Sequence, residues 1–264
     1  MRAHRLLAIP ALLLIAIAGS ASPAAQTDAG TSGLHLKPAF HFELFSRTLT
    51  WDDGTRSSRL LSPQAFVGLD FEITPGFDIG LIGGYSLSNW NGLVFRNLPF
   101  SIDNQAGSIG GLIVGAEVRK RLFVSGFWEM DAEARFSAYL GQAASYPITG
   151  LAVEGQADLK GNWMRVEVGP VLIYRGFELF SPFLGVAYDR LWGKMTMTET
   201  IEDLEGTEEK KVAGAGAFAV SFGTIYEPST AFRIKIGATL IPFQKIGGGL
   251  GLDYGGTVRA GLAF

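Results

Sequence analysis

Apolar and polar side chains alternate along most of this 264-residue chain. Successive side chains of a β-strand point to opposite faces, so such alternation predicts strands with one apolar face and one polar face. In residues 34–51, for example, Phe40 and Phe42 alternate with His41 and Glu43. Because the pattern recurs almost to the end of the sequence, we expect an all-β chain.

Ten segments show this alternation, at residues 34–51, 61–73, 77–88, 106–119, 122–140, 163–174, 180–192, 212–226, 231–243 and 250–264. Strands of soluble proteins usually have about 5–6 residues, whereas strands that cross a membrane in a barrel have about 9–11. The longest segment, residues 122–140, is too long for an ordinary soluble sandwich. We therefore expect residues 34–264 to form one antiparallel transmembrane β-barrel of about ten strands, with eight or twelve strands as the alternatives.

The expected connections alternate between short and long. Tight turns are predicted at 74–76, 119–121, 175–177 and 227–230, longer loops at 52–58, 89–105, 141–156 and 193–211, and a short glycine turn at 247–249. In outer-membrane barrels the short turns face the periplasm and the long loops face outward. Aromatic side chains of an interfacial girdle are expected near the turns at Tyr174, Tyr226 and Phe264, and near the loops at Tyr188 and Trp192.

The first residues follow the plan of a secretory signal peptide. Arg2 and Arg5 precede an apolar run, and small residues follow it up to Ala21. The apolar run is shorter than the roughly 20 residues that a membrane-spanning helix needs. We expect a cleaved signal at 1–21 and a flexible mature N-terminus at 22–33. The sequence contains no cysteine, which excludes disulfides, thiolate metal sites and acylation as a lipoprotein.

The chain ends on "DYGGTVRAGLAF", in which apolar residues again alternate with polar ones. Together with the signal peptide and the strands over 34–264, this ending resembles the bacterial outer-membrane β-barrel family. The resemblance implies that the last strand carries the signal that the barrel assembly machinery reads, at Tyr254, Val258, Leu262 and Phe264. It also implies an outer-membrane location, and contacts with outer-membrane lipid and lipopolysaccharide.

The polar faces of the strands would point into the lumen of a closed barrel. They carry charges of both signs, at Glu43, Arg47, Glu129, Asp131, Glu133, Arg135, Arg165, Glu167 and Arg259. One interpretation is a network of ion pairs that fills a narrow interior, because buried charges must be paired. The other is a polar channel, kept partly open by small residues expected to face inward, namely Gly80, Gly84, Gly107, Gly111, Gly115, Ala213, Ala215, Ala217 and Ala219.

Two classes of function follow for such a barrel. The first is porin-like passage of small solutes or a structural role in the membrane. The second is a non-conducting barrel that binds a surface partner through the loops at 89–105 and 194–211. An enzyme is not expected. The omptin proteases and the lipid A-modifying barrels would require a histidine at the outer rim or near the end of the chain, whereas His35 and His41 both fall early in the first strand.

Other ligands have little support in the sequence. The net charge of −3 gives no reason to expect nucleic acid, and no motif for a cofactor is present. Acidic residues are concentrated at Glu199, Glu202, Asp203, Glu205, Glu208 and Glu209, but their spacing is not that of a calcium-binding loop. We expect a solvated loop there, with divalent-cation bridging to lipopolysaccharide or a partner as the alternative, and no metal site. The sequence leaves the oligomeric state open.

Overall fold

The computed structural model describes residues 35–54, 57–98, 102–103, 107–148, 154–213, 216–229, 232–244 and 249–262. Residues 36–264 form one compact unit. The predicted signal peptide, the N-terminal segment 22–33 and Phe264 lie outside the described residues, and so does Ala215. Within the described ranges, no helix is long and apolar enough to cross a membrane.

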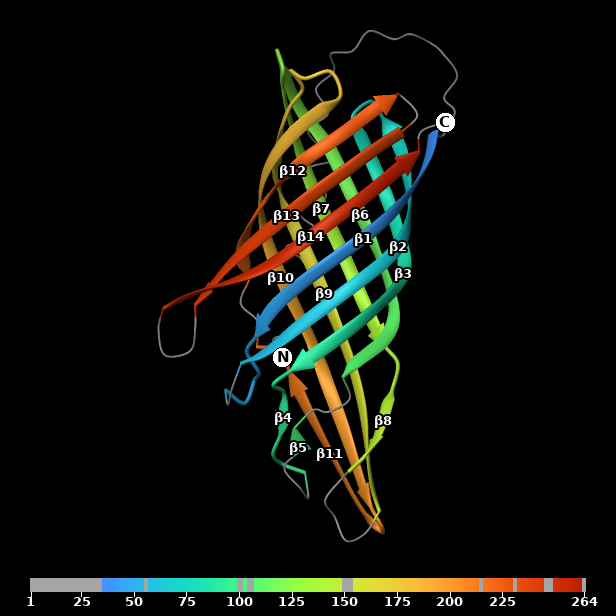
Figure 1. Ribbon diagram of the computed structural model, residues 1–264, viewed down its shortest axis with the longest axis vertical. Helices are drawn as coiled ribbons and strands as arrows, with labels where there is room; N and C mark the ends of the chain where they lie inside the picture. Colours follow the sequence, from blue (N-terminus) through green and yellow to red (C-terminus); the bar gives the residue numbers. More distant parts are fainter. Residues whose placement is uncertain are drawn as a thin grey trace, which may run out of the picture. The chain divides into compact units, whose positions relative to one another are not determined.

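Ten antiparallel strands form a closed ring (Figure 1). In ring order they are β1 (His35–Leu49), β2 (Ser58–Thr74), β3 (Phe77–Asn91), β6 (Ser108–Ser125), β7 (Trp128–Gly141), β9 (Gly155–Tyr174), β10 (Phe180–Ile201), β12 (Ala217–Ser229), β13 (Phe232–Gln244) and β14 (Leu250–Leu262). The ring closes where β14 pairs with β1, with Val258 opposite Phe42. The predicted ten-stranded antiparallel barrel is confirmed.

Four further strands lie at the end of the ring that carries the long connections, which we call the loop side. They are β4 (Val94–Phe95), β5 (Ile102–Asp103), β8 (Ala144–Pro147) and β11 (Leu204–Lys211). β8 pairs with the first part of β9, and β11 pairs with the last part of β10. The predictions of loops at 141–156 and 193–211 are therefore partly wrong. Alternation continues there, because Met195 and Met197 are fully buried while Thr196 between them is only partly buried.

The opposite end of the ring carries the short connections, and we call it the turn side. The predicted turn at 119–121 is wrong, because β6 continues to Ser125 and the chain reverses at Gly126. Gly126 has a φ of +59°, in the left-handed region that glycine adopts without steric cost. Arg119 lies opposite Glu133 and Arg121 opposite Asp131 in the β6–β7 pairing. Arg119 and Arg121, which the sequence analysis placed in a turn, are therefore strand residues opposite acidic residues of β7.

The outer face of the barrel is apolar. Exposed side chains on it include Phe40, Phe42, Val67, Leu69, Leu81, Leu112, Val114, Phe136, Leu184, Val186, Phe222, Ile236, Val258 and Leu262. Phe40 is 65% exposed and Phe42 is 56% exposed, so the outward positions of β1 are those that the alternation predicts. An apolar surface of this extent is not stable in water. It is the surface expected of a barrel that lies in a lipid bilayer.

Aromatic rings border the apolar face at both ends. On the turn side, Tyr174 packs against Trp128 and Tyr226 against Phe180, each pair with ring centroids 4.9 Å apart. On the loop side, Tyr188 lies at the end of the apolar stretch of β10 and is 41% exposed. Amphipathic aromatic side chains favour the boundary between lipid and water. These positions give two boundaries for the lipid-facing band.

Candidate functional site in the barrel interior

The loop side of the interior is filled by apolar side chains, which we call the aromatic layer. Its members on the ring strands include Phe45, Leu60, Trp90, Ile109, Ile113, Tyr139, Leu159, Trp163, Leu191, Met195 and Met197. Outside the ring strands, Trp51, Leu93, Leu98 and Phe95 of β4 also belong to it. The Trp163 ring stacks on Tyr139 at 5.6 Å and meets the Phe45 ring edge-on at 5.2 Å. Tyr139 and Trp163 are 1% exposed or less, so these rings are packed without room for water.

The sequence did not reveal this layer, because we expected polar side chains at every inward position. On the loop-side part of β6, Ile109 and Ile113 point inward while Leu112 and Val114 point outward. Both faces of this segment are apolar, so the two-residue alternation disappears there. A loss of alternation within an otherwise alternating strand is the signal that could have identified the layer.

Below the aromatic layer, Arg165 of β9 is the centre of a network of ion pairs. Its guanidinium donates to Glu43 at 2.8 Å, to Asp189 at 2.6 Å and to Glu167 at 2.7 Å. The second oxygen of Glu43 accepts a hydrogen bond from Arg135 at 2.6 Å. Because these residues come from β1, β7, β9 and β10, the network joins strands that are not neighbours in the ring.

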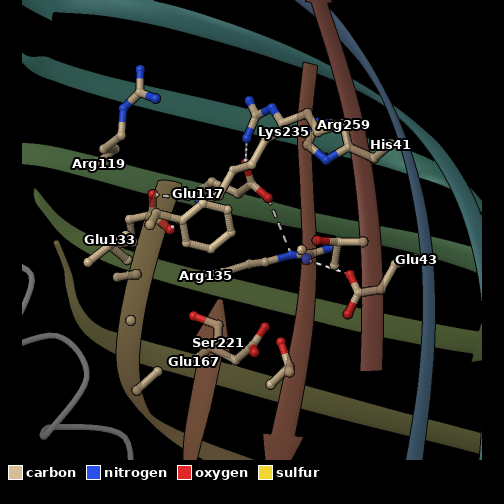
Figure 2. A pocket seen from close by; sticks show the side chains of 18 of the residues that line it. His41, Glu43, Glu117, Arg119, Glu133, Arg135, Glu167, Ser221, Lys235 and Arg259 are labelled. Atoms are coloured by element: carbon tan, nitrogen blue, oxygen red, sulfur yellow. Dashed lines mark hydrogen bonds and ion pairs between the residues drawn. The ribbon is translucent and has the colours of Figure 1, made fainter. Parts of the chain in front are cut away.

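The network continues across the lumen from Arg135. Arg135 lies 3.3 Å from Glu117, and Glu117 accepts a hydrogen bond from Arg259 at 2.7 Å (Figure 2). Arg259 also pairs with Asp70, which adds β2 and β14 to the set of connected strands. On the loop side of the network, Arg47 pairs with the same Asp189 that Arg165 contacts.

The aromatic layer contacts the charged network directly. The guanidinium carbon of Arg165 lies 4.9 Å from the centroid of the Phe45 ring, and that of Arg135 lies 5.0 Å from the Phe66 ring. Cations above aromatic faces are stabilised by the ring quadrupole, most strongly where water is excluded. The two layers therefore stabilise each other.

The acidic residues predicted at 129, 131 and 133 lie toward the turn side. Glu129 accepts hydrogen bonds from Arg121 at 3.1 Å and from Arg175 at 2.9 Å. Glu133 pairs with Lys235 at 3.1 Å. Asp131 is 3% exposed. The structure thus places all nine predicted network residues in the interior, but in a central group around Arg165 and a separate group near the turns.

A cavity of about 770 Å³ lies beside the network and extends to the turn-side ends of β1 and β13, where Lys37 and Arg233 line it. Charged side chains line it from several strands, including Lys235 of β13 and Arg259 of β14. Small residues occupy the other inward positions of β10, β12, β13 and β14, and we call this set the small-residue wall: Gly185, Ala187, Ala219, Ser221, Gly237, Thr239, Gly255 and Thr257.

The prediction that small residues on β3 and β6 keep the lumen open is wrong. A side chain at Gly84 would collide with Phe66, and one at Gly111 would collide with Tyr139. Larger neighbours therefore already occupy the space beside these glycines. Of the small residues that the sequence analysis named, Ala219 lines the cavity.

The last strand presents the expected face. Tyr254, Val258 and Leu262 are all exposed on the outside of β14, at 43%, 42% and 38%. Phe264, the fourth member of the predicted assembly signal, lies outside the described residues.

The acidic segment predicted as a solvated loop is a β-hairpin formed by β10 and β11. Its carboxylates point to two faces. Glu208 is buried and accepts a hydrogen bond from the backbone N–H of Asn97 at 2.8 Å, whereas Glu209 on the other face accepts from Lys194 at 2.8 Å.

Hydrogen bonds from Ser145 and Gln156 hold the pKa of the nearby Asp158 below its usual range. Across the part of the chain that the structure covers, no three acidic or histidine side chains are grouped as metal ligands.

Comparisons with known proteins give similarity in fold alone. No protein-family model matches the chain, and no curated sequence is similar to it. The outer-membrane protease OmpT from Escherichia coli is 12% identical, with a TM-score of 0.48 over 90% of this chain and 100% of OmpT. An outer-membrane channel from Pseudomonas putida is 11% identical, with a TM-score of 0.44 over 91% of this chain and 100% of the channel. Ail from Yersinia pestis is 9% identical, with a TM-score of 0.32 over 88% of this chain and 99% of Ail. All three TM-scores are below 0.5, so these similarities do not assign a function to the chain.

Proposed function

We propose that this protein is a bacterial outer-membrane β-barrel that does not conduct ions in its resting state and that presents its loop-side strands to partners at the cell surface. The observation that carries the proposal is the aromatic layer. Because its rings pack against each other across the loop side of the lumen, ions and solutes have no continuous aqueous path through the barrel.

The ion-pair network supports the same proposal. A wide channel would leave its charged side chains hydrated, whereas Glu43, Arg165 and Asp189 are 6% exposed or less. Buried charges persist only when partners compensate the cost of removing them from water. The network therefore serves as an internal scaffold that joins opposite sides of the barrel.

The loop-side strands provide the surface for binding. β8, β9, β10 and β11 extend past the ring as a four-stranded sheet. Its outward face carries hydroxyl and charged groups, such as Thr198, which shares a hydrogen bond with Thr207 at 3.1 Å, and Lys194. A regular polar surface on strands is more rigid than a loop, and rigidity lowers the entropic cost of binding.

The proposal includes no catalytic residue and no cofactor. His41 is 8% exposed and stacks on Phe66 with ring centroids 4.8 Å apart, inside the lumen rather than at a rim. The proposed partners remain outer-membrane lipid and lipopolysaccharide, the barrel assembly machinery and a surface ligand of the loop-side sheet. No nucleic acid is proposed.

Single-channel recording in planar bilayers tests whether the barrel is closed. We expect no conductance steps from the wild-type protein and steps from a variant with Trp90→Ala and Trp163→Ala, which opens the aromatic layer. Trp192→Ala, outside this layer, is the matched control and should stay silent. Steps in the wild type whose ion selectivity changes with Glu129→Ala, Asp131→Ala and Glu133→Ala would overturn the proposal in favour of porin-like passage.

The surface role needs a separate test. Replacing residues 198–207 with an Asn-Gly turn removes the paired ends of β10 and β11 and keeps Met197 of the aromatic layer. The truncated barrel should still fold and should bind bacterial-surface or host-surface extracts less than the wild type does. Undiminished binding would exclude the hairpin as the binding surface.

A further inference from the structure

We propose that the cavity beside the ion-pair network is a binding site for a small uncharged molecule that has an apolar face and at least one hydroxyl group. Its volume of about 770 Å³ lies within the range of about 300–1,000 Å³ that is usual for ligand pockets. This inference goes beyond the proposed function and does not depend on whether the barrel conducts.

The cavity exists because the positions of the small-residue wall have no large side chains. Gly185, Ala187, Ala219 and Gly237 occupy inward positions on three adjacent strands, and the ring of Phe183 lies at the turn-side end of this wall. Packed interiors rarely leave a space of this size. A surface of glycine, alanine and an aromatic ring favours contact with the apolar face of a ligand.

The charged side chains that line the cavity argue against an ionic ligand. Every aspartate, glutamate, lysine and arginine side chain that lines the cavity, among the described residues, has an opposite charge within ion-pairing distance. The pairs are Lys37–Asp78, Arg119–Asp78, Arg135–Glu43, Arg135–Glu117, Arg165–Glu43, Arg165–Glu167, Arg233–Glu227, Lys235–Glu133, Arg259–Asp70 and Arg259–Glu117. An ionic ligand would have to compete with these existing partners, several of which are buried.

Hydroxyl groups, by contrast, are available on the small-residue wall. Ser221, Thr239 and Thr257 line the cavity, and none of the three makes a side-chain hydrogen bond with another residue that the structure describes. Each hydroxyl can donate one hydrogen bond and accept others. A hydroxyl on the ligand would satisfy these groups without disturbing the ion pairs, and this defines the chemical class of the ligand.

Three probes of the same shape test this class. 4-Fluorobenzyl alcohol, 4-fluorobenzoate and 4-fluorobenzylammonium differ in charge at neutral pH, and ¹⁹F NMR can follow each one with the full mature barrel in lipid nanodiscs. We expect saturable binding of the alcohol and at least about tenfold weaker binding of either ion, since tenfold corresponds to about 1.4 kcal/mol. Empty nanodiscs correct for partitioning into lipid.

Two matched variants locate the binding. Ser221→Phe fills the cavity and should abolish saturable binding of the alcohol. Val220→Phe changes the neighbouring residue, which faces outward, and should leave binding unchanged. If Ser221→Phe does not fold, Thr239→Leu fills the same space from β13.

Equal affinity for the alcohol and for either ion would overturn the assignment of the ligand class. Binding that survives in the folded cavity-filling variant would overturn the site itself. Both readouts are separate from conductance, so failure of this inference and failure of the proposed function can be told apart.

Discussion

Glu43 and Arg165 are 122 residues apart in the sequence, and their side chains lie 2.8 Å apart inside the barrel. Glu43 also accepts a hydrogen bond from Arg135, so one carboxylate compensates two guanidinium groups. All three side chains are mostly or fully buried. The stability of the barrel should therefore be sensitive to this one carboxylate.

We expect Glu43→Ala to lower the free energy of unfolding by about 3–5 kcal/mol, because it leaves two buried cations without their shared partner. Urea unfolding in lipid vesicles, followed by tryptophan fluorescence, measures the change. Glu205→Ala on the exposed hairpin is the control and should change stability by no more than about 0.5 kcal/mol. Equal changes in the free energy of unfolding for the two substitutions would show that the ion pairs of Glu43 do not stabilise the barrel.

The aromatic layer should also contribute to stability. Trp163 packs on Tyr139 and Phe45 and donates a hydrogen bond to the Ser88 hydroxyl at 3.2 Å. Replacing a buried tryptophan with alanine typically costs about 3–5 kcal/mol, and we expect Trp163→Ala to fall in this range. The unfolding experiment above measures it, and Trp192→Ala should cost less because that side chain is only partly buried.

Charged substitutions on the outer face test the position in the membrane. Val67 is 46% exposed on β2, within the apolar band. If lipid covers this residue, Val67→Arg should lower the free energy of unfolding in a bilayer by about 2–4 kcal/mol. Thr198→Arg on the loop-side sheet should be nearly neutral. A neutral effect at Val67 would contradict the assignment of this face to lipid.

The contact between β8 and β9 should depend on pH. Asp158 accepts hydrogen bonds from Ser145 and from Gln156, the latter at 3.1 Å, and both favour the ionised form. Because the folded pKa of Asp158 is lowered, its contribution is present above the unfolded pKa and is lost as the pH falls through the folded pKa. The effect on stability should be small, because this carboxylate is exposed and solvent screens it.

Ser145→Ala should raise the pKa of Asp158 toward its usual value, which NMR titration of the side-chain carboxyl carbon can measure. Ser145→Thr keeps the hydroxyl and should leave the pKa low. A pKa that does not respond to Ser145→Ala would mean that this hydrogen bond is not the main cause of the shift.

The ring of strands could be predicted from the sequence because contact with lipid requires apolar side chains on the outer face of the barrel. Every strand in a bilayer must present apolar side chains outward, so the alternation survives on each of them. The same rule explains the correct prediction of ten strands and of their outward positions, such as Phe40 and Val258.

The interior was harder to predict, because its composition depends on what meets across the lumen. Whether Gly84 opens space depends on Phe66 of the neighbouring strand, and no local pattern reports that contact. The residues that form the cavity wall, such as Gly237 and Ser221, are also indistinguishable in sequence from small residues elsewhere. Their importance follows from their adjacency on β12 and β13.

The pairing of β14 with β1 has a consequence for biogenesis. The ring has no free edge once Val258 lies opposite Phe42, but both edges are open until the last strand has been synthesised. Exposed strand edges recruit other chains and lead to aggregation. A ribosome adding residues in order cannot produce a closed intermediate, so the ring can close only after its first and last strands have both been synthesised.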